Sequence, residues 1–222
     1  MTSDQPDASA ATTELALSVI DAARARSVPL RLLGGRAVHV LCREFPPRTS
    51  ASQDIDLAAY AKDRRAAVTI LSEVGLQPDR NFNAVHGHRQ LYFTTPDGHA
   101  VDVMLDQLTM CHVLPFAGRL ERTSYTLDPT DLLLSKLQVV EQNEKDLHDI
   151  TQLLSAFPVS PGDAADTIAL ARFEAVVQSD WGWWRTVTGS LERVRSLLAG
   201  EMSHHIPPGE HLDPIAQAGA LL

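Results

Sequence analysis

The sequence has few cysteines, a minority of basic residues and no long apolar run. Two cysteines, Cys42 and Cys111, are too few for the disulfide framework of a small secreted domain. Both have apolar neighbours, so we expect two buried thiols in a reducing compartment. Because no apolar run approaches the ~18 residues needed to span a bilayer, we expect a cytoplasmic protein with no membrane partner.

Basic side chains are outnumbered: 19 Lys and Arg residues stand against 28 Asp and Glu residues, and the formal net charge is −9. This balance argues against a protein that only binds nucleic acid, because phosphate contacts need Lys and Arg. It leaves room for an enzyme with a local basic patch. It also suits a cationic small-molecule acceptor, which a negative field attracts.

The chain divides by composition into four parts. Residues 1–12 are mostly small or polar, which predicts a disordered leader, and they lack the basic and apolar regions of a signal peptide. We expect a mixed α/β core over 13–127 and a helical domain over 128–200. The remaining residues, 201–222, are rich in Pro, Gly and His, which predicts a loosely ordered tail.

Apolar periodicity and turn residues locate the expected elements within these parts. In the α/β core, helices are predicted over 13–26, 36–45 and 63–74, and strands over 30–33, 54–60, 90–95, 99–105 and 119–127. In the helical domain, helices are predicted over 129–141, 144–157, 163–178 and 181–198, the first of them opened by an Asp128-Pro129 cap.

Three carboxylates in the predicted strands carry the strongest chemical signal. Asp54 and Asp56 are two residues apart, so on a strand their side chains share one face and repel each other. Asp102 stands within an apolar strand, where an unpaired carboxylate is costly. One divalent cation shared by all three would relieve both problems, and oxygen ligands favour Mg²⁺ or Mn²⁺. Asp106 shares a face with Asp102 and stays an alternative third ligand.

A glycine pair, Gly34-Gly35, precedes the second predicted helix. Glycines let a backbone approach phosphates closely, and the N–H groups at the start of the following helix can bind them. Metal ions held by carboxylates can grip a triphosphate and activate an acceptor hydroxyl for in-line attack on the α-phosphorus. Together the two features predict a phosphoryl-transfer site.

This arrangement of Gly34-Gly35, a helix, Asp54-x-Asp56 on a strand and Asp102 on a nearby strand resembles the polymerase-β-type nucleotidyltransferase superfamily. The resemblance implies an α/β core with a small mixed sheet and transfer of a nucleoside monophosphate from an NTP. It covers residues 30–155 in separate blocks. That family often has Ser or Thr after the glycine pair, where this chain has Arg36, whose guanidinium could contact phosphate instead. Ser52 fits the family's loop before the paired acids and is a second nucleotide-binding candidate.

Two further blocks, from Asp131 to Lys136 and from Lys145 to Asp149, resemble the downstream motifs of AbiEii-type nucleotidyltransferase toxins of type IV toxin–antitoxin systems. The resemblance implies that Lys136 contacts the nucleotide phosphates and that Asp146 is important for activity. It also implies an RNA acceptor, namely a tRNA 3′ end, and a cognate antitoxin as partner. Two other functions stay open: an antibiotic nucleotidyltransferase acting on an aminoglycoside or lincosamide, and an inactive nucleotide-binding homologue.

Histidines in the last part of the chain are a weaker metal signal. His204, His205 and His211 could bind a metal, but in an acidic, loosely ordered tail we expect solvated side chains instead.

Overall fold

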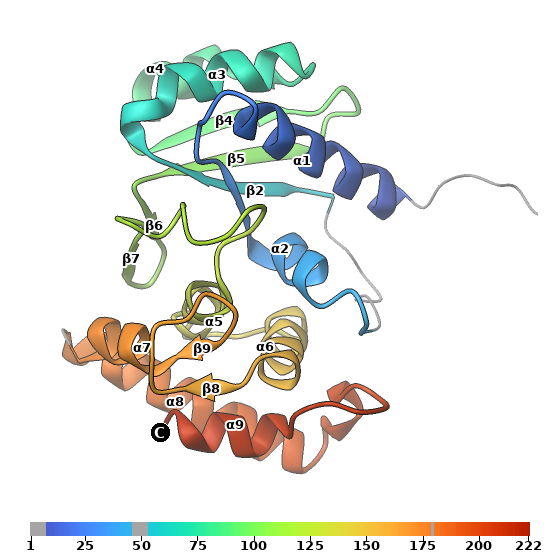
Figure 1. The fold of residues 1–222 in the computed structure, drawn as a ribbon, viewed down its shortest axis with the longest axis vertical. Helices are drawn as coiled ribbons and strands as arrows, with labels where there is room; N and C mark the ends of the chain where they lie inside the picture. The colour runs from blue at the N-terminus through green and yellow to red at the C-terminus, as the bar shows by residue number, and fades with distance from the viewer. Residues whose placement is uncertain (1–7, 46–52, 179) are drawn as a thin grey trace, which may run out of the picture. The chain divides into compact units, whose positions relative to one another are not determined.

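A computed structural model describes residues 8–45, 53–178 and 180–222 (Figure 1). The chain is a mixed α/β structure with a small mixed sheet, as predicted. It forms two compact units. The first comprises Met1–Arg36, Thr49–Leu108 and Pro115–Leu127, and the second comprises Ala37–Arg48, Thr109–Leu114 and Asp128–Leu222. The second unit therefore consists mainly of residues 128–222, and it also includes two short segments that precede residue 128 in the chain.

The first unit is organised around a five-stranded sheet with the order β1-β2-β5-β4-β3. Its strands are β1 (Arg31–Leu33), β2 (Ile55–Ala59), β5 (Ala100–Leu105), β4 (Gln90–Thr94) and β3 (Gln77–Pro78). Only β2 and β5 run parallel, and the other neighbours are antiparallel. Buried residues alternate along β4 and β5, so one face of these strands packs into the core and the other is half-exposed.

The first unit contains α1 (Ala8–Arg24), α3 (Arg64–Glu73) and α4 (Arg80–His86), with a short 3₁₀ turn, η1 (Ala61–Asp63). Helices α1 and α3 correspond to the helices predicted over 13–26 and 63–74, whereas α4 was not predicted. Helix α1 packs on α3, and α4 packs on β4 (Figure 1). A fourth helix, α2 (Gly34–Leu41), begins directly after β1 at the glycine pair and continues into the second unit.

The second unit is mainly helical. Its helices are α5 (Pro129–Leu137), α6 (Glu144–Ala156), α7 (Leu170–Val177), α8 (Trp181–Ala199) and α9 (Pro214–Ala220), with a 3₁₀ turn, η2 (Ser203–His205). Two short strands, β8 (Val159–Ser160) and β9 (Ile168–Ala169), pair in parallel. A further pair, β6 (Gln107–Thr109) and β7 (Val113–Pro115), forms a two-stranded ribbon whose residues are assigned partly to the first unit and partly to the second.

Side-chain caps start the two helices that carry the downstream motifs. The Asp128 carboxylate accepts a hydrogen bond from the Asp131 amide, with Pro129 in the first turn of α5, as the sequence predicts. The Asn143 side chain accepts from the amides of Lys145 and Asp146 at the start of α6, and the Asp146 side chain accepts from the Asn143 amide. This reciprocal capping fixes the first turn of α6.

Several predictions were wrong. The strand expected over 119–127 is not formed: in this described stretch, only Thr126 makes a β-bridge, to Leu32. The tail over 201–222 is ordered into η2 and α9, and Ala218 of α9 is fully buried. Helix α1 starts at Ala8, so residues 8–12 do not belong to a disordered leader, while residues 1–7 lie outside the described part. Cys111 is exposed, whereas Cys42 is buried as expected.

These errors have physical causes. Turns are stable over 119–127 because side chains provide their hydrogen-bond partners, as when the Tyr60 hydroxyl accepts from the Leu120 amide. Small residues in 8–12 and 214–220 carry no periodic apolar signal, yet they can pack closely against neighbouring helices. Among the described helices, none is both long and apolar enough to cross a bilayer.

Candidate active site

Asp56 and Asp102 lie directly beside each other. The parallel register of β2 and β5 pairs Asp56 with Asp102, flanked by Ile55 with Val101 and Leu57 with Val103. Paired residues on neighbouring strands project to the same face, and the strands are about 4.8 Å apart. The apolar flanking residues are buried on the opposite face. Two carboxylates 46 positions apart in the chain are thus neighbours on the half-exposed face of the sheet.

Asp54 adds a third negative charge at this place. It stands immediately before β2 and is exposed. Burial raises the pKa of the Asp102 carboxyl, and the nearby charge of Asp54 raises it further. A hydrogen bond that the Gln90 side-chain amide donates to Asp102 Oδ1 acts in the opposite direction. The carboxyl of Asp102 is therefore costly to ionise unless a cation is nearby.

Gly34 lies against the carboxylate of Asp56. Its φ is +70°, in the left-handed region that favours glycine. A Cβ atom at this position would lie 2.4 Å from Asp56 Oδ2, far inside van der Waals contact. The first turn of α2, where Gly35 and Arg36 follow, therefore begins beside a carboxylate of the cluster. Only a residue without a side chain permits this approach.

Arg36 donates hydrogen bonds to α1 and to the backbone just before β2. Its Nη1 donates to Thr13 Oγ1 at 2.7 Å and to the Ser9 carbonyl at 3.2 Å, and its Nε donates to the Asp54 carbonyl at 3.4 Å. The residue is only 9% exposed. The guanidinium thus connects α1 to the backbone that positions Asp54. Ser52, the other predicted phosphate contact in this region, lies outside the described residues.

Asp106 lies away from the three acids. It follows β5 four residues after Asp102, which corresponds to about 13 Å along a strand. Its φ is +62°, and its Oδ1 accepts a hydrogen bond from the Ala61 amide at 2.9 Å. The register of β2 and β5 therefore favours Asp102 over Asp106 as the third carboxylate.

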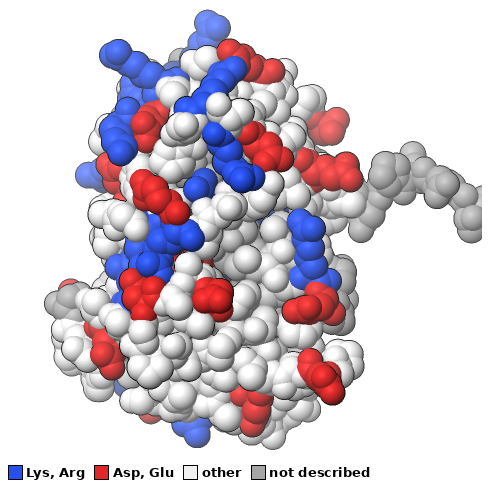
Figure 2. Space-filling model, in the orientation of Figure 1, with Lys and Arg blue, Asp and Glu red and all other residues white. Residues whose placement is uncertain are grey.

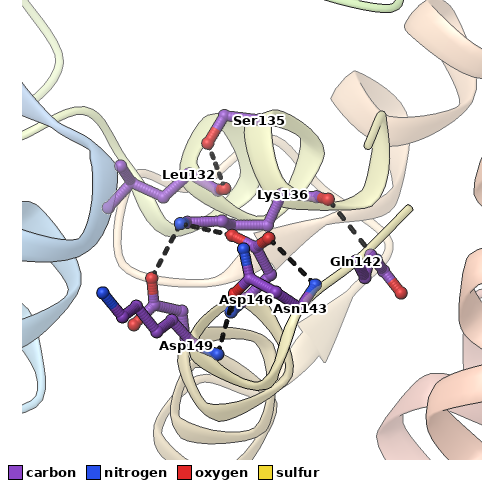
Figure 3. A network of polar contacts seen from close by, with 8 residues as sticks. Leu132, Ser135, Lys136, Gln142, Asn143, Asp146 and Asp149 are labelled. Carbon is purple, nitrogen blue, oxygen red and sulfur yellow. Dashed lines mark hydrogen bonds and ion pairs between the residues drawn. The ribbon is translucent and has the colours of Figure 1, made fainter. Parts of the chain in front are cut away.

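The second unit holds a separate buried ion cluster around Lys136 (Figure 3). Lys136 Nζ on α5 lies 2.9 Å from Asp146 Oδ1 and 2.9 Å from Asp149 Oδ2, both on α6. The Lys136 side chain is 13% exposed and that of Asp149 is 1% exposed. Burial acts to lower the pKa of Lys136, but the two carboxylates outweigh it, and the pKa is raised. The amine stays charged at neutral pH.

Sequence reasoning missed two members of these clusters. Asp149 ends the Lys145–Asp149 motif but is not among the predicted site residues, although it is the more buried partner of Lys136. Its signal was present, because Asp146 and Asp149 are three residues apart and so share one face of a helix. Gln90 could not be found without the pairing of β4 and β5, because no local pattern connects it with Asp102.

Comparison with known proteins leaves the family open. No protein-family model and no curated protein matches the chain. Among solved structures, it is similar to the lincosamide antibiotic adenylyltransferase LnuA with lincomycin bound, at 16% identity and a TM-score of 0.45 over 63% of this chain and 94% of that one. It is also similar to the antibiotic-resistance factor ANT(2'')-Ia, at 13% identity and a TM-score of 0.46 over 88% of this chain and 98% of that one. At these values neither likeness assigns an activity.

Proposed function

We propose that this chain is a metal-dependent nucleotidyltransferase that moves a nucleoside monophosphate from an NTP to an acceptor hydroxyl. The observation that carries the proposal is the in-register pairing of Asp56 with Asp102, next to a glycine that brings the start of α2 against Asp56. Three carboxylates gathered at one place repel one another, and this set of oxygen ligands fits Mg²⁺ or Mn²⁺.

Each residue of the site has a proposed role. Asp54, Asp56 and Asp102 would hold the cation, which when bound neutralises phosphate charge and lowers the pKa of the acceptor hydroxyl. Asp102 would also accept the proton of the acceptor hydroxyl. Gln90 orients that carboxylate through Oδ1. The amides of Gly35 and Arg36 at the start of α2 are the proposed phosphate donors.

Lys136 and Asp146 have a proposed role that rests on the motif resemblance. Lys136 supplies a permanent positive charge for the nucleotide phosphates, and its raised pKa keeps that charge in place. Asp146 holds the Lys136 amine at 2.9 Å and also caps α6. We therefore assign Asp146 a positioning role, in which it acts on the nucleotide through Lys136.

The acceptor is proposed from motifs and charge. The downstream motifs favour RNA, in particular a tRNA 3′ end, and a toxin that a cognate antitoxin neutralises. Exposed arginines on or after α3 and α4 add local positive charge, which supports this choice; they are Arg64, Arg65, Arg80 and Arg89. Figure 2 shows Lys and Arg side chains interspersed with Asp and Glu over this part of the surface. The net charge of −9 supports the alternative, a cationic aminoglycoside or a lincosamide.

An assay that follows a labelled nucleotide to its acceptor distinguishes these functions. Purified protein is incubated with Mg²⁺ and each α-labelled NTP, together with either total tRNA or a panel of aminoglycosides and lincosamides. Label on RNA supports the toxin function, and label on a drug supports resistance. Binding of NTP without transfer to any acceptor would contradict catalysis and identify an inactive homologue.

A matched pair of variants tests the site itself. Asp56→Asn should lower transfer by about 100-fold or more, the scale expected when stabilisation of transition-state charge is lost. Asp106→Asn should retain transfer. Asp106 lies four positions after Asp102, away from the cluster, and its carboxylate accepts a hydrogen bond from the Ala61 amide. Equal activity of the two variants would contradict the assignment of the site.

A further inference from the structure

A second, separate group of metal-ligand side chains lies in the second unit. Glu144 is the first residue of α6, and His204 and His205 belong to η2, about 60 positions later in the chain. One ligand atom from each of the three residues lies within 4.8 Å of the others. The fold has therefore brought two imidazoles and a carboxylate to one point, between a helix start and a 3₁₀ turn.

His205 is the residue that points to a ligand. Its side chain is 8% exposed, and its Nε2 atom is buried without a hydrogen-bond partner. A buried polar nitrogen in this state carries an unfavourable desolvation cost, and buried polar atoms nearly always have a partner. The Nε2 atom lies 3.5 Å from Glu144 Oε1, which is an ion-pair distance but long for a hydrogen bond. A ligand between the two atoms would bind the buried nitrogen and the exposed carboxylate together.

The separation of these atoms fits coordination to one ion. Zinc binds imidazole nitrogen and carboxylate oxygen at about 2.0–2.2 Å, so two ligands of a tetrahedral site are about 3.4 Å apart. The 3.5 Å between His205 and Glu144 matches that value. His204 is exposed, so a rotation of its side chain can close the remaining distance at little cost.

We propose that Glu144, His204 and His205 bind a Zn²⁺ ion, with water completing a tetrahedral site. Imidazole nitrogen favours Zn²⁺ over Mg²⁺, which takes oxygen ligands. The ring of His148 meets that of His205 edge-on at a centroid distance of 5.8 Å and helps to orient it. The Glu144 carboxylate offsets the repulsion between a cation and the positive end of α6.

Such an ion has a structural consequence. It fastens η2 to the first turn of α6, the same turn in which Asn143 and Asp146 form the capping box. Zinc should therefore stabilise the fully folded chain by mass action, and the gain should grow with the free zinc concentration.

Competition with a chromophoric zinc chelator tests the site in the full-length protein after treatment with EDTA. The wild type should bind one Zn²⁺ per chain and gain thermal stability. His204→Ala and Glu144→Gln each remove an exposed ligand and should weaken affinity by about tenfold or more. His88→Ala, an exposed histidine in the first unit, is the matched control and should bind like wild type.

Cobalt gives an independent readout, because tetrahedral Co²⁺ absorbs much more strongly in the visible range than octahedral Co²⁺. The wild type should show this absorption, and His204→Ala should lose it. The proposal is overturned if the wild type binds no zinc at micromolar concentration, or if both ligand variants bind like wild type. It is also overturned if Asp56→Asn abolishes zinc binding, since the ion would then occupy the carboxylate cluster.

Discussion

Gly34 determines how closely backbone can approach Asp56. Two separate constraints act on this position: a φ of +70°, and a Cβ contact of 2.4 Å with the Asp56 carboxylate. Gly118 has nearly the same φ, +68°, but nothing lies within 4 Å of its Cβ position. A comparison of Gly34 with Gly118 therefore separates the effect of the backbone conformation from the effect of the contact with the carboxylate.

Gly34→Ala and Gly118→Ala should each lose about 1–2 kcal/mol of unfolding free energy, the cost of a left-handed conformation for a residue with a side chain. Only Gly34→Ala should also lose nucleotidyl transfer, because its methyl group displaces Asp56. Urea denaturation and the labelled-NTP assay measure the two effects. A similar loss of activity in both variants would show that strain alone explains it.

Asp102 combines a proposed catalytic role with a stability cost. Its pKa is raised in the folded chain, mainly by burial, so the folded state favours the protonated form. The penalty is absent below the ordinary carboxyl pKa of about 3.9 and develops as the pH rises through the raised pKa. Without metal at pH 7, Asp102→Asn should therefore raise the melting temperature while it abolishes transfer.

The pH and metal dependence check this prediction. The difference in melting temperature between Asp102→Asn and wild type should disappear below about pH 4, where both side chains are neutral. Mg²⁺ should stabilise the wild type and not the variant. Asp106→Asn is the comparison, since the variant weakens a hydrogen bond to the Ala61 amide and should not stabilise the protein.

At the scale of elements, the ion cluster joins α5 to α6. Lys136→Met would remove the ammonium that lies 2.9 Å from the buried Asp149 carboxylate, and breaking a buried pair in this way costs about 3–5 kcal/mol. Lys145→Met, at an exposed position of α6, should stay within about 0.5 kcal/mol of wild type. Because the pKa of Lys136 is raised, its contribution should persist as the pH rises from 7 to about 10.4 and decline above that. Chemical denaturation at pH 7 and pH 11 measures both effects.

Helix α9 is an integral part of the second unit. It packs on α6 and α8, and the Val159 amide donates a hydrogen bond to Gln217 Oε1 at 2.9 Å. Ala218 is fully buried, whereas Ala220 of the same helix is exposed. Ala218→Glu should therefore cost at least about 2 kcal/mol and Ala220→Glu less than about 0.5 kcal/mol, as measured by thermal denaturation. Equal stability of the two variants would mean that α9 does not pack in solution.

Strong local signals allowed elements of both units to be predicted. Apolar periodicity and turn residues located β4 and β5, and the Asp128-Pro129 cap located the start of α5. The pairing of Asp56 with Asp102 could not be predicted, because register depends on contacts between strands that are distant in sequence. Likewise, Glu144 has no local relation to His204 and His205, so the group they form is visible only in the folded chain.

At the scale of the whole molecule, two compact units carry two different metal-ligand sets. The carboxylates belong to the first unit, and the two histidines with Glu144 belong to the second. Each ion should therefore protect a different part of the chain. In hydrogen–deuterium exchange, Mg²⁺ should slow exchange in β2 and β5, and Zn²⁺ should slow it in η2 and the first turn of α6. Protection of one region by both ions would contradict two separate sites.

The double use of Asp146 has a consequence for genetics. One oxygen pairs with Lys136, and the side chain also caps the amide of Asn143. A loss-of-function allele at this codon would alter the lysine and the start of the helix at once. If the proposed toxin function is used to select surviving cells, such an allele is therefore poor proof that the carboxylate takes part in the reaction.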